Sequence, residues 1–175
     1  MPSHAFAYPQ TAKDPMKRAA LVTISLLTLS LAACTGSQTP AVTKSWVNGS
    51  CTTEQPGVTL SVDYLGEVQT HCALNYEGNG WGLFEAAGFS VKGTAKYPTA
   101  FACKIDGEPK AFMCEESDPQ TSYWGYYTVN NGKWDYATTG ASDHQSICGT
   151  WEGWVFIENA STESHLPEPK EFDCK

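Results

Sequence analysis

The sequence predicts an α+β fold that is mostly β: a small antiparallel sheet with one short helix, stapled by disulfides. Three observations predict it. Several short segments alternate apolar with polar residues, which is typical of strands with one buried face. One segment beyond the N-terminal leader carries helix start and stop signals. Seven cysteines in 175 residues are typical of an exported, disulfide-bonded chain.

The first segment with a clear pattern is an export signal. Met16-Lys17-Arg18 is a short basic start, and residues 19–31 form an apolar run that is too short to span a bilayer as a helix. Leu31-Ala32-Ala33-Cys34 resembles the bacterial lipobox. The resemblance implies that residues 1–33 are a signal peptide, with Met16 as the true start, and that diacylglycerol on Cys34 anchors the chain to the extracytoplasmic face of the cell membrane. The alternative is a plain secretory signal followed by a chance cysteine.

The part from Cys34 onward is strongly acidic. It has 142 residues (175 − 33), with eight Lys against eighteen Asp or Glu, so its formal net charge is 8 − 18 = −10. The only Arg of the chain, Arg18, lies in the leader. Such a surface is a poor match for nucleic acid or anionic lipid, because both require clustered positive charge. We therefore expect no nucleic-acid partner.

Six cysteines remain once Cys34 is assigned to lipid, and an even number in an exported chain predicts three disulfides. We predict the pair Cys103–Cys114, because Asp106-Gly107 between them is a turn signal that lets two antiparallel arms meet. The pairing of the other four stays open, although Cys174 is expected to tie the C-terminal tail back to the body. These four are Cys51, Cys72, Cys148 and Cys174.

The first strand of the domain is predicted over residues 57–64. Apolar and polar residues alternate cleanly there, which is typical of a half-buried strand. Residues 65–67 are expected to turn the chain, and residues 68–74 to return as a second strand.

Residues 79–89 are the only good helix candidate beyond the leader. Asn79 can cap the start, and Gly88 suits the left-handed residue just past the end, where Phe89 can cover Phe84. Two glycines near the start limit the expected helix to about two turns.

The segment after the helix is expected to be a loop over residues 90–99 and a strand over residues 101–105. The acidic run at residues 115–118 has two interpretations, a cation site or a solvated loop. We favour the loop, because loops that bind hard cations place oxygen ligands at a stricter spacing around a glycine hinge.

A hairpin is predicted from residues 123–127 to residues 133–136. The two segments flank Asn130-Asn131-Gly132, and Asn-Gly is a strong hairpin signal. Residues 154–157 have no polar gap, which predicts a strand covered on both faces.

The ends of the domain are polar. Residues 34–45, rich in Thr, Ser, Gly, Pro and Gln, are expected to be a flexible tether. From about residue 158 a polar tail with two prolines is expected to wrap around the body. No repeat or second boundary occurs between these ends, so residues 46–175 are expected to form a single domain.

Taken in order, these elements resemble a known family. The resemblance rests on the segments L-F-E-A-A-G-F (83–89), F-A-C-K-I-D-G (101–107), S-Y-W-G-Y-Y (122–127), N-N-G-K-W (130–134) and G-T-W-E-G-W-V-F (149–156). They are similar to the transcobalamin-like C-terminal domain, the small β-rich cap of vitamin B12 carriers. The resemblance implies a β cap that contributes to a corrinoid site. The carriers add a large helical barrel, for which 142 residues (175 − 33) leave no room, and the six cysteines also depart from their pattern. A corrinoid would then meet half a site, or a partner would supply the rest.

No motif argues for chemistry. His71, His144 and His165 fall at no metal-ligand spacing, and no G-x-S-x-G occurs. The cysteines of the exported part are assigned to lipid or disulfides, which leaves no thiol nucleophile. We expect no enzyme, no metal and no resident cofactor.

The aromatic surplus between residues 122 and 156 suggests two functions. One is non-catalytic binding of a small molecule such as a corrinoid, with delivery to a membrane transporter, because flat rings suit a macrocycle. The other is a surface module that contacts a protein or glycan. Against both stands the possibility that these rings only fill the core. The ligand-binding candidates are Trp124, Tyr126, Trp134, Tyr136 and Trp151, and a site is expected at the rims around Trp134 and Trp151.

Overall fold

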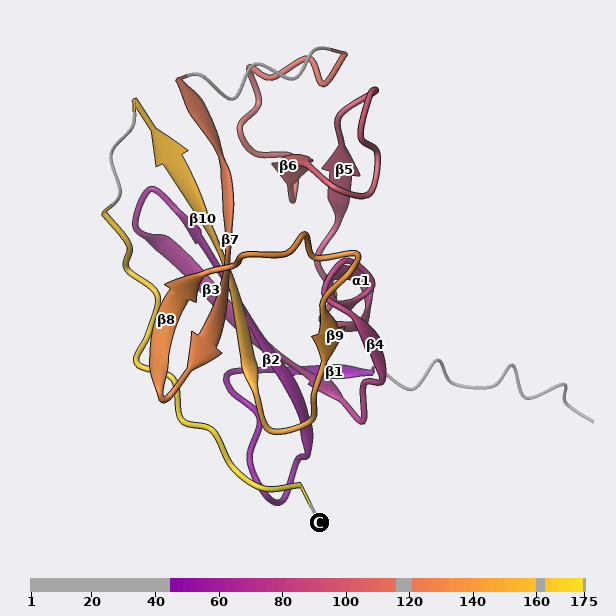
Figure 1. Cartoon of the computed structure of the whole chain (residues 1–175), viewed down its shortest axis with the longest axis vertical. Helices are drawn as coiled ribbons and strands as arrows, with labels where there is room; N and C mark the ends of the chain where they lie inside the picture. The colour runs from indigo at the N-terminus through magenta and orange to yellow at the C-terminus, as the bar shows by residue number, and fades with distance from the viewer. Residues whose placement is uncertain (1–44, 116–120, 160–162, 175) are drawn as a thin grey trace, which may run out of the picture. The chain divides into compact units, whose positions relative to one another are not determined.

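The described part of the chain is built around a six-stranded β-sheet (Figure 1). The structure, a computed structural model, describes residues 45–115, 121–159 and 163–174. The strands of the sheet lie in the order β1-β3-β2-β10-β7-β8. Their bounds are Trp46–Asn48 (β1), Gly57–Tyr64 (β2), Glu67–Leu74 (β3), Ser122–Asn130 (β7), Lys133–Tyr136 (β8) and Trp151–Glu158 (β10). The prediction of a mostly β fold is confirmed.

The two central strands, β2 and β10, run parallel. Every other neighbouring pair in this sheet is antiparallel, so the sheet is mixed, and the expectation of an antiparallel sheet is wrong at this pair. Tight turns join β2 to β3 and β7 to β8, and such turns make antiparallel neighbours. The chain reaches β10 only after a long connection, and a long connection allows two strands to run parallel. No residue pattern in the sequence predicted this direction.

β2 is buried on both faces, and the prediction of a half-buried strand is wrong in this respect. Its apolar residues face the core, while Thr59, Ser61 and Asp63 are covered on the other side. Each of these polar side chains has a hydrogen-bond partner, which removes most of the cost of burying it. Thr59 accepts from the N–H of Cys51, Ser61 pairs with the Thr70 hydroxyl, and Asp63 accepts from the N–H groups of Gly66 and His165.

The hydrophobic core lies on one face of the sheet and is rich in aromatic rings. Trp154 contacts Phe84 and Tyr126, with ring centroids 5.1 and 4.9 Å apart. Rings of this size fill the space between the sheet and the short helix. The buried members of the cluster are Val58, Leu60, Val62, Ala73, Leu83, Phe84, Ala87, Phe89, Ile105, Trp124, Tyr126, Ala141, Trp154 and Phe156.

The opposite face of the sheet is contacted by the C-terminal tail, residues 163–174, which has no regular secondary structure. The Trp134 indole N–H donates to the carbonyl oxygen of Pro167 at 2.8 Å. The Trp151 indole N–H donates to that of Lys170 at 3.1 Å. Two tryptophans of the sheet therefore hold the tail in place, which confirms that it packs back on the body.

Two further links secure the tail. The Nδ1 atom of His165 lies 3.3 Å from the buried carboxylate of Asp63. The Cys148–Cys174 disulfide fixes the last described residue, as predicted for Cys174. The tail therefore serves as a second cover for the sheet where no second layer of strands or helices is present among the described residues.

The helix α1 (Leu83–Ala86) has one turn and is shorter than predicted. Asn79 does not cap it, because Asn79 belongs to β4 (Gly78–Asn79), which pairs with β9 (Gln145–Ser146). The Asn79 side chain still accepts a hydrogen bond from the N–H of Gly82 at 2.9 Å. The glycine-rich start thus forms a turn rather than helix, in line with the low helix propensity of glycine.

The end of the helix is as predicted. Gly88 adopts the left-handed conformation at φ 81°, and the N–H of Phe89 donates to the carbonyl of Phe84 at 2.8 Å. No helix within the described ranges is long and apolar enough to cross a membrane.

A short hairpin follows the helix. β5 (Val91–Gly93) pairs with β6 (Ala102–Ile105), so the expectation of a loop over residues 90–99 is wrong for β5. A strand of three residues is too short to show alternation in the sequence. The predicted turn at Asp106 and Gly107 is present, with φ values of 49° and 83°.

The β7–β8 hairpin is confirmed. Asn131 and Gly132 connect the strands with φ values of 52° and 73°, the two left-handed residues that a tight hairpin turn requires. β10 is buried on both faces along all but its last residue, as predicted for residues 154–157.

The three disulfides are Cys51–Cys72, Cys103–Cys114 and Cys148–Cys174. The predicted pair Cys103–Cys114 is confirmed. The predicted leader, Cys34 and residues 34–44 of the tether lie outside the described residues, as do residues 116–118 of the acidic run.

Removing the Cys148–Cys174 disulfide tests the role of the tail. In the double variant Cys148→Ser/Cys174→Ser, we expect a loss of about 3 kcal/mol in the free energy of unfolding, from the closure entropy of the 26-residue separation. We also expect a change in tryptophan emission, because Trp134 and Trp151 lose their cover. Urea unfolding and fluorescence spectra measure the two effects.

The control is Cys103→Ser/Cys114→Ser, which removes a disulfide that does not hold the tail. Because Cys103 and Cys114 line the same pocket as Trp124, both double variants are compared in a Trp124→Phe background. There the control should lower stability and leave the emission unchanged. Equal spectral changes in both double variants would contradict the tail's role as a cover.

Candidate functional site

The candidate site is a pocket of about 920 Å³ beside the first half of β7. We call it the aromatic pocket. It lies between this part of β7, the β5–β6 hairpin with its connecting loop, and residues 111–115. It is lined by Thr94, Tyr97, Phe101, Ala102, Cys103, Ala111, Phe112, Met113, Cys114, Glu115, Thr121, Ser122, Tyr123, Trp124 and Tyr136.

Two segments of the wall are joined by backbone hydrogen bonds and a disulfide. The N–H of Ala95 donates to the carbonyl of Cys114 at 2.8 Å, and the N–H of Thr94 donates to the carbonyl of Phe101 at 3.1 Å. The Cys103–Cys114 bond adds a covalent link between β6 and the segment after the turn. The irregular wall is therefore fixed by bonds rather than by regular structure.

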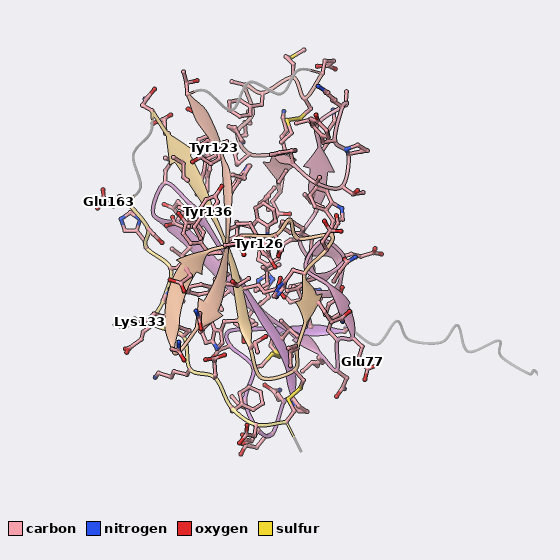
Figure 2. All side chains as sticks on the ribbon, in the orientation of Figure 1. Glu77, Tyr123, Tyr126, Lys133, Tyr136 and Glu163 are labelled. Carbon is pink, nitrogen blue, oxygen red and sulfur yellow. A yellow bond between two sulfur atoms is a disulfide. The ribbon has the colours of Figure 1, made fainter. Side chains whose placement is uncertain are left out.

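The third wall is a stretch of β7 that is paired with a neighbouring strand on one side only, within the described residues. β8 pairs with β7 from Tyr127 to Asn130, so within the described residues the stretch 122–125 pairs with β10 alone. In Figure 2, Tyr123 lies towards the upper end of β7, with Tyr136 below it and Tyr126 lower still. The pocket follows this stretch because β8 ends before it.

The lining is mostly aromatic and apolar. Six of the fifteen lining residues are aromatic: Tyr97, Phe101, Phe112, Tyr123, Trp124 and Tyr136. Phe112 and Trp124 both contact the core residue Phe156, with ring centroids 5.7 and 5.3 Å apart. The base of the pocket is thus continuous with the hydrophobic core.

The pocket also gathers exposed apolar side chains. Of the six large hydrophobic residues that are exposed in the described part of the chain, four line it: Tyr97 (39%), Phe101 (52%), Tyr136 (55%) and Met113 (75%). Single exposed apolar residues are common on proteins, whereas a cluster around a cavity is typical of an interaction site.

The five sequence candidates are divided by the structure. Trp124 and Tyr136 line the aromatic pocket. Tyr126 is buried in the core. Trp134 and Trp151 donate hydrogen bonds to the tail, on the face of the sheet opposite the core, and do not belong to the described lining of the pocket. The shared location of these residues in the sequence therefore does not correspond to one site.

Five further large side chains of the pocket were missed: Tyr97, Phe101, Phe112, Met113 and Tyr123. Most lie in loop segments, where apolar residues show no periodicity to interpret. The sequence did contain a signal for these residues. Large apolar residues in a segment without a strand or helix pattern have no evident place in the core, and they are therefore candidates for a binding surface.

A second cluster surrounds the fully buried carboxylate of Glu152 in β10. The Tyr126 hydroxyl donates to its Oε2 atom at 2.5 Å, and Nε2 of His144 lies 3.6 Å from its Oε1 atom. Burial raises the pKa of Glu152 above its ordinary value, although the nearby Ser146, the hydrogen bond from Tyr126 and the nearby His144 act in the opposite direction. Burial and Glu152 also raise the pKa of Tyr126. The cluster joins β10, β7 and the segment around β9.

The other histidines have structural contacts. His71 is stacked between Trp46 and Phe89, with centroids 4.2 and 4.5 Å away, and its Nδ1 bonds to the carbonyl of Ala87. His165 contacts Asp63 as described above. Among the residues that the structure describes, no group of three or more His, Cys, Asp or Glu can hold a metal ion.

Comparison with known proteins finds no match among protein-family models, curated proteins or solved structures.

The buried Glu152 predicts how stability depends on pH. The unfolded chain ionises this carboxyl near the ordinary pKa of 4.5, whereas the folded chain does so at higher pH. The unfolded state therefore binds fewer protons in this window, and the free energy of unfolding falls as pH rises through it. We expect Glu152→Gln to show a smaller fall in the free energy of unfolding than the unsubstituted protein as pH rises above 4.5, measured by urea unfolding.

The matched control is Glu158→Gln, at the exposed end of the same strand. It should keep the pH dependence of the unsubstituted protein. An unchanged pH dependence in Glu152→Gln would exclude Glu152 as its source.

Proposed function

We propose that this protein is an exported, membrane-anchored lipoprotein whose domain binds a small molecule in the aromatic pocket without catalysis. The observation that carries the proposal is a pocket of about 920 Å³ with six aromatic residues among its fifteen lining residues. Its volume lies within the range of roughly 300–1,000 Å³ that is usual for ligand sites. The lipobox-like segment ending at Cys34 supports the anchor.

The arrangement favours binding over a purely structural role for these rings. Phe112 and Trp124 pack on the core, but Phe101 and Met113 leave more than half of their surface in water. A ligand that covers these exposed groups gains the free energy of burying them, about 25 cal/mol per Å². The wall is also held by a disulfide, which reduces the entropy lost on binding.

A corrinoid is the specific ligand that we put forward. The sequence resemblance to the cap of vitamin B12 carriers supports it, and a flat macrocycle is suited to stacking on exposed rings. A lipid anchor would hold such a carrier beside a membrane transporter that receives the ligand.

The second candidate is a surface interaction module that binds a peptide. It is favoured by the stretch 122–125 of β7, which pairs on one side only within the described residues. An extended peptide can add to such an edge as a further strand, with its side chains in a neighbouring apolar pocket. This candidate uses the same pocket with a different occupant.

Ligand titration followed by tryptophan fluorescence tests the proposal. The domain is titrated with cobalamin, cobinamide and N-phenyl-1-naphthylamine, a neutral apolar probe. We expect saturable binding, with Phe101→Ser and Met113→Ser each weakening it about tenfold, because each removes an apolar side chain that the ligand covers.

The control variant is Ile147→Ser, which removes an equally exposed apolar side chain (62%) outside the pocket. It should leave affinity unchanged. Binding of the neutral probe alone would exclude the corrinoid as the ligand and support the pocket as a small-molecule site. If none of the three compounds binds saturably, the small-molecule proposal is wrong and the peptide module is favoured.

A further inference from the structure

The aromatic pocket has few charged side chains. Among the described residues that line it, Glu115 is the one charged residue, and it is acidic. No Lys, Arg or His belongs to this described lining. A ligand with a buried negative charge would therefore find no cation to pair with, which is costly.

We propose that the ligand carries a positive charge on a largely apolar body, as a quaternary ammonium or a protonated amine does. This inference rests on the proposed binding of a small molecule in the same pocket, and it names an organic cation as the ligand in place of the corrinoid.

The aromatic rings of the pocket favour a cation. The face of an aromatic ring attracts a cation, and the attraction grows when the cation is partly removed from water. Tyr97 already makes such a contact, because the ammonium of Lys96 lies 5.1 Å from its ring centroid. Tyr97 and Phe101 are 5.1 Å apart at their centroids and tilted by 58°, so they form two walls of different orientation.

Six aromatic residues around one cavity offer several ring surfaces to the same guest. Proteins recognise quaternary ammonium groups with several aromatic rings around one site. A neutral guest gains from the apolar contacts alone, whereas a cation gains from these contacts and from the rings' negative faces.

The negative charge of the chain also favours a cation. Glu115 is an exposed residue of the lining. The chain from Cys34 onward carries a formal net charge of −10 (8 − 18). A field of this sign attracts cations and repels anions before any contact is made. The local charge and the rings therefore favour the same class of ligand.

Lys96 lies over the ring of Tyr97 but does not belong to the described lining of the pocket. Its ammonium takes one position over that ring. The remaining rings of the pocket, among them Tyr123 and Tyr136, have no cation–aromatic contact with a lysine among the described residues. They remain available to a guest.

Three matched compounds test the inference. They are (2-naphthylmethyl)trimethylammonium, its uncharged carbon isostere 2-neopentylnaphthalene, and the anion 2-naphthylmethanesulfonate. Their shapes are similar and their charges differ. We expect the cation to bind roughly 2- to 30-fold more tightly than the neutral isostere, and the anion to bind most weakly, in titrations followed by tryptophan fluorescence.

Variants then locate the preference. Glu115→Gln should reduce the ratio of cation to neutral affinity about two- to fivefold, with little effect on the neutral isostere. Glu77→Gln is the matched control, because it removes the same charge from an exposed residue outside the pocket lining, far from Tyr123 in Figure 2. It should leave the ratio unchanged.

The outcomes separate the two proposals. Equal binding of the cation and the neutral isostere overturns the inference and leaves the proposed function standing. Preference for the anion overturns it as well. If none of the three compounds binds but cobalamin, cobinamide or N-phenyl-1-naphthylamine does, the inference fails and the proposed function stands. If no compound of either series binds, both proposals fail. Equal effects of Glu115→Gln and Glu77→Gln would assign the preference to net charge rather than to the pocket, which also overturns the inference.

Discussion

The structure depends on burying the two central strands of the sheet on both faces. β2 and β10 run parallel at its middle, and nearly every residue in them is covered. A sheet with two buried faces requires two covers. One is the aromatic core under α1. The other is the tail, which lacks strands and helices in its described residues and depends on individual bonds: two indole N–H donors, the contact of His165 with Asp63, and a disulfide.

This requirement explains why polar residues occupy the middle of the sheet. Thr59, Ser61 and Asp63 face the tail side of β2, where each forms a hydrogen bond. Glu152 faces the core side of β10 and binds Tyr126 and His144. Buried polar groups of this kind fix strand register, because a shift of one residue would turn them away from their partners. The hydrophobic effect holds the strands together, and the polar contacts specify their register.

Much of the fold was predictable from local signals. Asn131-Gly132 and Asp106-Gly107 predicted two turns, because few residues other than glycine and asparagine accept positive φ. The pairing of Cys103 with Cys114 followed from one of them. The burial of Thr59 and the direction of β10 were not predictable, since both depend on segments distant in sequence. The positions of the candidate aromatic residues also depend on distant segments: Trp124 and Tyr136 line the pocket, whereas Trp134 and Trp151, with the same composition signal, bond to the tail.

The aromatic pocket occurs where the two covers end. β8 is four residues long against nine in β7, so the first half of β7 extends beyond its neighbour. The tail contacts the sheet at Trp134 and Trp151, and the wall beside residues 122–125 is made instead by the β5–β6 hairpin and its disulfide. If these rings served the core alone, burial would be their expected state, as it is for Trp154. Phe101, Met113 and Tyr136 are exposed although the chain has bonds that fix the wall around them. A fixed wall with uncovered rings is suited to a guest that covers them, and the carboxylate of Glu115, the one charged group in the described lining, favours a guest with a positive charge.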